Sequence, residues 1–342
     1  MMWSMSMKKP IKVKFQGFQS KRYINGIKLE ETWLYKILDK NFDIIECEDA
    51  DYIICSCFNK YEYCGTKQIR IMYSGENYIP DFNLIDYSIC SYPIEFGDRN
   101  CYLPASLFGY DDERKIIENR KNCFDSTIFE RKTKFANLIA SYDSENSYRS
   151  KIFNELSKYK FVDSPGKFLK NCDEEVRFQD RSKVNFQKQC KFSICVESAI
   201  NCGFNTEKIM DAFYAETIPV YYGDPDICKI FNKNAFINIA DFDSIGEAVE
   251  KIIEIDNNDE LYLKMLNEPI FNEENYISRK FEEAEKFLVE IFERPLEECG
   301  RRSKVYWPLG HEEFLIKATK TYNFLYKNKV YLFLKSIFRK IR

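Results

Sequence analysis

The feature that most constrains the fold of this chain is an alternation of short apolar runs, rich in β-branched and aromatic residues, with longer helical stretches. In the first third of the sequence we expect strands at residues 11–15, 42–45, 52–55, 69–73 and 87–90 and an amphipathic helix at 30–39. Strands separated by helices are typical of a mostly parallel sheet covered by helices. The first third therefore predicts an α/β layer.

The alternation stops at one polar, charged stretch and then begins again. Residues 111–134 form this stretch, which we interpret as a linker between domains. Beyond it we expect strands at residues 135–140, 192–197 and 218–221 and helices at 148–159, 206–214 and 245–255. Because a chain of 342 residues usually forms more than one domain, the pattern predicts two Rossmann-like domains that face each other across a cleft.

Charge is distributed unevenly along the chain, whose formal net charge of −3 gives no indication of a nucleic-acid partner. Residues 314–342 contain eight basic residues and no acidic one, interleaved with aromatic and aliphatic residues at spacings of three and four. This pattern is typical of an amphipathic helix that lies on an anionic membrane surface. A helix that docks on the protein with its lysines in solvent is the alternative.

The thirteen cysteines do not form the spaced pairs of a zinc site, and several, including Cys55, Cys90 and Cys195, lie within apolar runs. We interpret them as reduced thiols. The N-terminus lacks the apolar segment of a signal peptide, and no run approaches the eighteen apolar residues of a spanning helix. The sequence therefore predicts a cytoplasmic protein, bound at most peripherally to the inner face of a membrane.

The chain has a single histidine, His311, in its C-terminal region. A Ser-His-Asp triad, a Cys-His pair or a His-rich metal site would depend on this one residue. If the protein is an enzyme, we therefore expect carboxylates to carry its acid–base chemistry.

The most informative motif lies where the strand at residues 192–197 leads into the helix at 206–214. Ligands of open α/β sheets bind beyond the carboxyl ends of the strands, where helix N-termini present free N–H groups. Thr206 is the expected N-cap, and Glu207 and Lys208 would lie in the first turn. Lys208 would suit a pyrophosphate, and Glu207 could accept hydrogen bonds from a ribose or face a developing sugar cation. An ordinary capped helix with solvated side chains is the alternative.

The segment that contains this motif, residues 192–242, resembles the donor-binding signature of the alpha-1,3/alpha-1,4-fucosyltransferases, glycosyltransferase family 10. Its blocks follow the family's order: Val-Glu-Ser-Ala at 196–199, Phe-Asn-Thr-Glu-Lys at 204–208, Ile-Pro-Val-Tyr-Tyr-Gly at 218–223 and Phe-Asn-Lys at 231–233. The resemblance implies that donor binding involves Arg149, Glu197, Ser198, Phe204, Asn205, Thr206, Glu207, Lys208 and Tyr222.

Two further blocks extend the resemblance toward the N-terminus. Ser-Tyr-Arg at 147–149 is similar to the family's first donor-domain block, whose arginine contacts the donor phosphates, and this implies the same role for Arg149. A guanidinium suits that role because it can hold two oxygens and stays charged. Ser-Gly-Glu-Asn at 74–77 resembles the block that supplies the general base in bacterial members, which implies that Glu76 is the base.

Departures from the family's pattern concern donor specificity. Val196 and Ser198 stand where the family has Phe and Asn, and Phe204 replaces a tyrosine whose hydroxyl could contact phosphate. A transferase that uses another GDP-sugar and a non-catalytic sugar-nucleotide binder are therefore the two alternatives. Retention of the base candidate Glu76 favours an enzyme, since a binding protein needs no base.

Asp-Pro-Asp at 224–226 has the Asp-x-Asp spacing that binds manganese in another glycosyltransferase fold. By the resemblance it lies in a loop without a metal role. We expect arginine and lysine, rather than a divalent ion, to neutralise the donor phosphates, and no cofactor beyond the donor substrate.

By this resemblance the chain has the GT-B fold, with an acceptor-binding domain at residues 1–128, a GDP-sugar-binding domain at 129–310 and a basic amphipathic tail at 311–342. The implied reaction is an inverting transfer of L-fucose from GDP-fucose to a hydroxyl of a surface glycan, O3 of N-acetylglucosamine being the expected position. Glu76 would remove the acceptor proton, and Arg149, Glu207 and Lys208 would complete the catalytic set.

Overall fold

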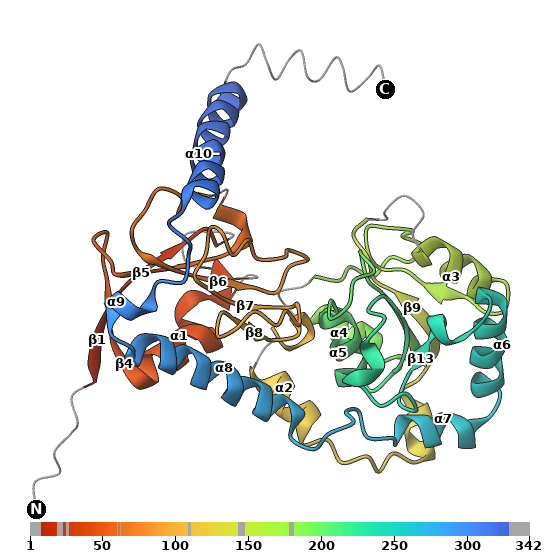
Figure 1. The fold of residues 1–342 in the computed structure, drawn as a ribbon. Helices are drawn as coiled ribbons and strands as arrows, with labels where there is room; N and C mark the ends of the chain where they lie inside the picture. Colours follow the sequence, from red (N-terminus) through yellow and green to blue (C-terminus); the bar gives the residue numbers. More distant parts are fainter. Residues whose placement is uncertain are drawn as a thin grey trace, which may run out of the picture. The chain divides into compact units, whose positions relative to one another are not determined.

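The computed structural model describes residues 8–18, 23–24, 27–59, 61, 63–108, 111–142, 148–177 and 181–327 (Figure 1). The chain forms two α/β units. The first consists of Met1–Cys90, Ile94–Cys101 and Ala284–Arg342, and the second of Ser91–Pro93 and Tyr102–Glu283. We call them the N-terminal unit and, after the role that the resemblance implies, the donor unit.

The N-terminal unit is built on a six-stranded sheet of order β4-β1-β5-β6-β7-β8. Its strands are β1 (Lys9–Gln16), β4 (Phe42–Glu46), β5 (Tyr52–Cys55), β6 (Ile69–Ser74), β7 (Tyr87–Cys90) and β8 (Asn100–Tyr102). In a separate small sheet, β2 (Tyr23–Ile24) pairs antiparallel with β3 (Ile27–Lys28). Every residue of β5, β6 and β7 is buried, as expected for parallel strands covered on both faces. The five strands predicted here are confirmed.

The helical segments of this unit come from both ends of the chain. They are η1 (Leu29–Glu31), α1 (Trp33–Asn41), η2 (Cys57–Asn59), most of α8 (Tyr276–Glu293), α9 (Leu296–Cys299) and α10 (Tyr306–Lys327). The predicted helix at 30–39 is divided, because Thr32 is the N-cap of α1 and its hydroxyl accepts a hydrogen bond from the Tyr35 N–H.

The donor unit contains a five-stranded parallel sheet of order β10-β9-β11-β12-β13. Its strands are β9 (Lys134–Leu138), β10 (Val162–Asp163), β11 (Cys190–Val196), β12 (Ile218–Tyr222) and β13 (Ile237–Asn238). Its helices are α2 (Asp111–Glu118), α3 (Tyr148–Ser157), α4 (Ser182–Gln187), α5 (Glu207–Tyr214), α6 (Ile245–Asp256) and α7 (Asp259–Leu266), with short turns η3 (Ala105–Leu107), η4 (Ser126–Glu130), η5 (Ile227–Lys229) and η6 (Ile239–Asp241). The order reverses between β9 and β11, which makes the carboxyl ends of these strands the expected ligand site.

The predicted linker at residues 111–134 is wrong, because this stretch is folded into the donor unit as α2, η4 and the start of β9. Its polar side chains bind the main chain of that unit. Arg114 donates to the carbonyl of Leu107, and Arg120 donates to the carbonyls of Phe213 and Leu266. The sequence shows that these residues are polar, but it does not show that their side chains donate hydrogen bonds to main-chain carbonyls of the same unit.

Both predicted domain boundaries also differ from the structure. The donor unit begins at Tyr102 rather than at 129, and it ends at Glu283 rather than at 310. From Ala284 the chain returns to the N-terminal unit, where the Phe292 ring lies 4.6 Å from the Tyr52 ring and the carbonyl of Phe292 accepts a hydrogen bond from Lys9.

The predicted tail at 311–342 is helical in its described part, since α10 extends from Tyr306 to Lys327, and residues 328–342 lie outside the described residues. Among the helices that the structure describes, none has the length and apolar character needed to cross a membrane.

Candidate functional site

A pocket of about 520 Å³ opens at the carboxyl ends of β9 and β11 in the donor unit. Segments far apart in the sequence form its lining: residues 139–142 after β9, the loop after β10 and the first turn of α5. Six cationic side chains line it, against two carboxylates. The cations are Arg149, Lys167, Lys170, Arg177, Lys183 and Lys208, and the carboxylates are Glu175 and Glu207. The excess of positive charge suits a polyanionic ligand.

The ammonium group of Lys208 forms an ion pair with the buried carboxylate of Glu197. Its ammonium lies 2.9 Å from Glu197 Oε2 and 2.7 Å from the Thr206 hydroxyl, and the Glu197 side chain is fully buried just after β11. Burial favours the neutral amine, but the charges of Glu207 and Glu197 outweigh it and raise the pKa of Lys208. The lysine therefore stays charged beside the pocket.

Glu207, whose side chain is about one-third exposed, lies between two lysines. Its Oε1 is 3.8 Å from the Lys208 ammonium and 3.9 Å from that of Lys183, which is 2.6 Å from Asp211. Burial acts to raise the pKa of Glu207, but the two lysines dominate and lower it to about 2. Glu207 is therefore an anionic acceptor at any physiological pH.

Arg149 is buried near the start of α3 and links two segments of the pocket wall. Its Nε and Nη2 donate to the carbonyl of Val196 at 3.2 and 3.1 Å, and its Nη1 donates to the carbonyl of Tyr142 at 2.8 Å. These bonds fix the cationic guanidinium in the lining of the pocket.

Thr206 is the N-cap residue of α5, as predicted, but its hydroxyl does not cap the helix. The hydroxyl and the backbone N–H of Thr206 both bind the Glu197 carboxylate, at 2.8 to 2.9 Å. The residue thus fixes the buried carboxylate that holds Lys208. The predicted N-cap position is therefore confirmed, and the side chain binds Glu197, nine positions earlier, instead of the first turn of the helix.

The loop after β10 supplies cations that the sequence motif did not indicate. Ser164 donates to the carbonyl of Leu138, and the two ends of the Asn171 side chain bind the Ser164 N–H and the Val162 carbonyl. At Gly166 an added Cβ would lie 2.5 Å from the Ala140 carbonyl oxygen, so only glycine allows this approach. The loop is therefore firmly built where it carries Lys167 and Lys170.

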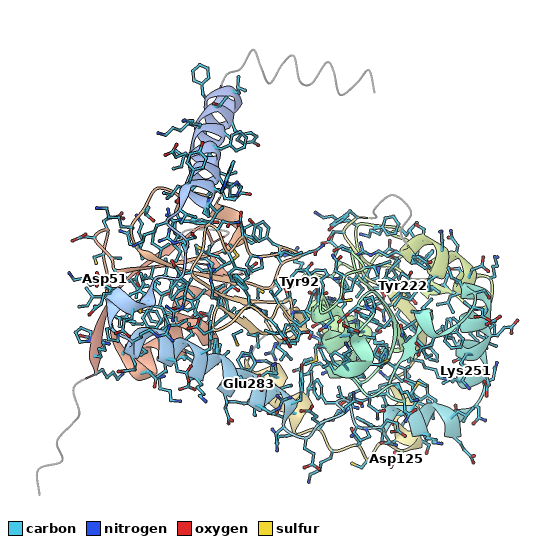
Figure 2. All side chains as sticks on the ribbon, viewed as in Figure 1. Asp51, Tyr92, Asp125, Tyr222, Lys251 and Glu283 are labelled. Atoms are coloured by element: carbon cyan, nitrogen blue, oxygen red, sulfur yellow. The ribbon has the colours of Figure 1, made fainter. Side chains whose placement is uncertain are left out.

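Five of the nine predicted donor residues do not line the pocket: Glu197 and Thr206, which bind Lys208, and Phe204, Asn205 and Tyr222. Asn205 is fully buried, accepts a hydrogen bond from the Ser106 hydroxyl at 2.6 Å and donates to Asp224 at 2.8 Å. Phe204 is buried as well, and Tyr222 (Figure 2) stacks on Tyr148 with ring centroids 3.8 Å apart. Ser198, by contrast, lines the pocket.

Asp224, the first carboxylate of the Asp-x-Asp motif, is buried and holds the loop before α5. It accepts hydrogen bonds from the N–H groups of Gly203 and Asp226 in addition to that from Asn205. Among the described residues, no group of three or more His, Cys, Asp or Glu side chains is arranged to hold a metal ion.

Glu76 belongs to the N-terminal unit, where it follows β6 and is exposed. Its backbone N–H donates to the Ser74 hydroxyl at 3.3 Å, and its carbonyl accepts from the Tyr78 N–H at 2.7 Å. It lies beyond the carboxyl end of a central parallel strand, as predicted, where side chains of α/β sheets meet their ligands.

Two family models match the chain. Residues 129–285 match "Glycosyltransferase family 10 (fucosyltransferase) C-term", and residues 17–109 match the "Alpha-(1,3)-fucosyltransferase FucT N-terminal domain". The two matches lie largely within the donor unit and the N-terminal unit respectively.

Sequence relatives include members from a bacterium, a virus and an animal. The chain is 29% identical over 237 residues to the alpha-(1,3)-fucosyltransferase FucT of Helicobacter pylori, covering 59% of this chain and 47% of that protein. It is 34% identical over 175 residues to the putative fucosyltransferase R654 of Acanthamoeba polyphaga mimivirus. This match covers 48% of this chain and 29% of that protein. It is 30% identical over 132 residues to mouse 4-galactosyl-N-acetylglucosaminide 3-alpha-L-fucosyltransferase 9. This match covers 38% of this chain and 35% of that protein. The chain thus spans half or less of the length of these relatives.

Solved structures support the fold. A crystal structure of an alpha1,3-fucosyltransferase superposes with a TM-score of 0.67 at 23% identity, covering 82% of this chain and 91% of that one. A crystal structure of an alpha1,3-fucosyltransferase with GDP-fucose superposes with a TM-score of 0.65 at 24% identity, covering 83% of this chain and 92% of that one. The predicted GT-B fold class is therefore confirmed. Together with the two family models, the motif blocks and the pocket at the β9–β11 crevice, this places the chain in glycosyltransferase family 10, the fucosyltransferase family.

Proposed function

We propose that this protein transfers L-fucose from GDP-fucose to a hydroxyl of a glycan acceptor. The observation that carries the proposal is the cationic pocket at the β9–β11 crevice, where Arg149 and Lys208 arrive from two different helices. A diphosphate needs such positive groups, and the Glu207 carboxylate beside them can accept hydrogen bonds from ribose hydroxyls. Relatives named as fucosyltransferases support the choice of sugar.

The proposed reaction is a single inverting displacement. Glu76 takes the proton from the acceptor hydroxyl while that oxygen forms a bond to the anomeric carbon of fucose. The bond from this carbon to the β-phosphate oxygen breaks on the opposite face, and GDP leaves with the electron pair. Arg149 and Lys208 stabilise the charge that develops on the leaving diphosphate.

For the acceptor we propose O3 of N-acetylglucosamine in a surface glycan. The support is the name of the mouse relative, which specifies a 4-galactosyl-N-acetylglucosaminide and the 3-position. The carboxylate after β6 provides a base for any such hydroxyl, but it does not select one sugar over another.

Release of GDP measures the proposed activity directly. We expect release from GDP-fucose only when a lactosamine-type acceptor is present, and we expect it to continue in EDTA, because the pocket's lysines and arginines can neutralise the diphosphate. GDP-mannose serves as the competing donor. Release from GDP-mannose alone would favour another donor, and GDP binding without any release would favour the non-catalytic alternative.

We also propose that the basic C-terminal segment binds an anionic membrane surface from the cytoplasmic side. The described part of α10 carries the exposed residues Trp307, Phe314 and Phe324 together with Lys317 and Lys320. Aromatic rings next to lysines are typical of interfacial helices. The protein should then sediment with vesicles that contain phosphatidylglycerol and remain in solution with phosphatidylcholine alone. Equal behaviour with both would contradict the proposal.

A further inference from the structure

A second pocket, of about 460 Å³, lies in the N-terminal unit between the carboxyl ends of β5 and β6 and one face of α10. Tyrosines dominate its lining, which includes Tyr61, Tyr63, Tyr78 and Tyr322, with Leu315 and Ala318 on the helix. None of the described residues that line it carries a charge. Burial raises the pKa of both Tyr63 and Tyr78, so these phenols stay neutral as well.

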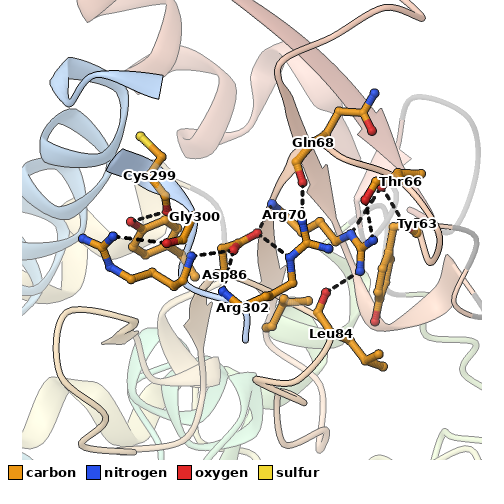
Figure 3. Close-up of polar contacts among 12 residues, drawn as sticks. Tyr63, Thr66, Gln68, Arg70, Leu84, Asp86, Cys299, Gly300 and Arg302 are labelled. Atoms are coloured by element: carbon orange, nitrogen blue, oxygen red, sulfur yellow. Dashed lines mark hydrogen bonds and ion pairs between the residues drawn. The ribbon is translucent and has the colours of Figure 1, made fainter. Parts of the chain in front are cut away.

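One ion pair and two hydrogen bonds fix the α10 wall of this second pocket. Glu312 accepts hydrogen bonds from Arg70 at 2.6 Å and from the Gly65 N–H at 2.7 Å, and His311 lies 2.8 Å from Asp81 Oδ2. Arg70 is fully buried and also donates to the Leu84 and Thr66 carbonyls (Figure 3).

The connection that leads into α10 is anchored separately. Arg302 donates to the buried carboxylate of Asp86 at 2.9 Å and to the carbonyl of Gln68 at 2.7 Å (Figure 3). Asp86 also accepts a hydrogen bond from the backbone N–H of Arg70 at 2.9 Å. The helix is thus tied to β6 and β7, and the pocket is preformed rather than dependent on closure.

The loop of the proposed base, Glu76, forms part of the same wall. Tyr78 lines the pocket and its N–H donates to the Glu76 carbonyl, while the Ser74 hydroxyl binds both the Glu76 N–H and, at 3.4 Å, the Cys57 sulfur in the lining. A group in this pocket therefore lies next to the loop from which Glu76 would act on an acceptor.

We infer that the second pocket binds a hydrocarbon chain that is attached to the acceptor glycan. The described lining has no carboxylate, amide or cationic side chain, and its polar groups are the hydroxyls of four tyrosines and Thr319 and the thiol of Cys57. Tyrosine faces and aliphatic side chains instead suit an apolar group, and the volume lies in the range of small-molecule pockets. The inference rests on the proposed function only in the identity of the attached glycan.

Binding without donor tests the inference independently of catalysis. Calorimetry on the full chain compares the octyl and methyl β-glycosides of N-acetyllactosamine. Because each methylene that is buried strengthens binding, we expect the octyl glycoside to bind at least tenfold more tightly. Ala318→Trp fills the pocket and should remove this preference. Thr321→Trp, an exposed position of the same helix, is the size-matched control and should retain it.

The outcomes separate the inference from the proposed function. Equal affinity for the two glycosides in the wild type, or an unchanged preference in Ala318→Trp with native circular dichroism, overturns the inference even if fucose transfer is found. If Ala318→Trp does not fold, Thr319→Phe at the adjacent lining position replaces it and should likewise remove the preference. An octyl preference that Ala318→Trp removes, in a protein that releases no GDP, supports the pocket and contradicts the transferase.

Discussion

The ammonium of Lys208 lies 2.9 Å from Oε2 of Glu197, a carboxylate with no exposed side-chain surface. The pair places a full positive charge at the pocket wall and neutralises a buried negative charge beneath it. Lys208 therefore has a structural role beside the ligand-binding role that we propose for it, and a single substitution tests both.

Lys208→Ala should abolish GDP binding and also lower the free energy of unfolding by about 3 kcal/mol, because it leaves Glu197 buried without a counter-charge. From the sequence alone, this variant would be expected to fold normally. The double variant Glu197→Gln/Lys208→Met should recover most of the stability but not the binding. Urea denaturation and GDP titration measure the two effects. A double variant as unstable as Lys208→Ala would contradict the pairing.

Glu76→Gln should leave GDP-fucose affinity unchanged and lower kcat at least a hundredfold, since the amide keeps the size of the side chain but cannot take a proton. Glu48→Gln, an exposed carboxylate of the same unit, is the control and should keep full activity. Transfer at the wild-type rate by Glu76→Gln would exclude this carboxylate as the base.

Gly166→Ala should weaken GDP binding and lower stability by about 1–3 kcal/mol, because its Cβ would lie 2.5 Å from the Ala140 carbonyl oxygen and the loop would have to move. Gly246→Ala in α6 provides the contrast. Its nearest contact is 3.6 Å away, so the alanine should stabilise that helix by about 0.5–1 kcal/mol. Thermal unfolding with and without GDP distinguishes the two variants. Equal unfolding temperatures for Gly166→Ala and Gly246→Ala would be inconsistent with a tightly packed loop at Gly166.

Lys132 predicts a pH dependence of stability. Burial lowers the pKa of its amine to about 7, from an ordinary value near 10.5 that the unfolded chain retains. Between these values the unfolded state binds more protons, so the contribution of Lys132 to stability rises as the pH increases from 7 to 10.

Lys132→Met should therefore raise the free energy of unfolding at pH 7 and reduce its slope between pH 7 and 10. Denaturation at several pH values measures both, relative to the wild type. Parallel pH curves for the two proteins would mean that Lys132 is charged in the folded state.

The alternating strands and helices could be predicted, because each leaves a regular pattern of apolar residues in the sequence. A strand such as β5 (Tyr52–Cys55) is an uninterrupted apolar run, and two residues of the predicted motif, Glu207 and Lys208, line the pocket at the ends of β9 and β11. Lys183 and the loop lysines were missed because they carry no periodic signal and reach the pocket only through the packing of β10 and α4. The role of Glu197 was also hidden, since a sequence does not show which carboxylates are buried.

The main segment of the donor unit, Tyr102–Glu283, is inserted within the N-terminal unit, because the chain enters this segment from Cys101 and returns to the N-terminal unit at Ala284. On the ribosome, the inserted unit can finish folding while its host still lacks α9 and α10. The host is completed only when the last helices emerge. Deleting α9 and α10 would therefore remove part of the core of the N-terminal unit, whose strands are synthesised first. The donor unit, which is synthesised afterwards, would keep every strand of its sheet.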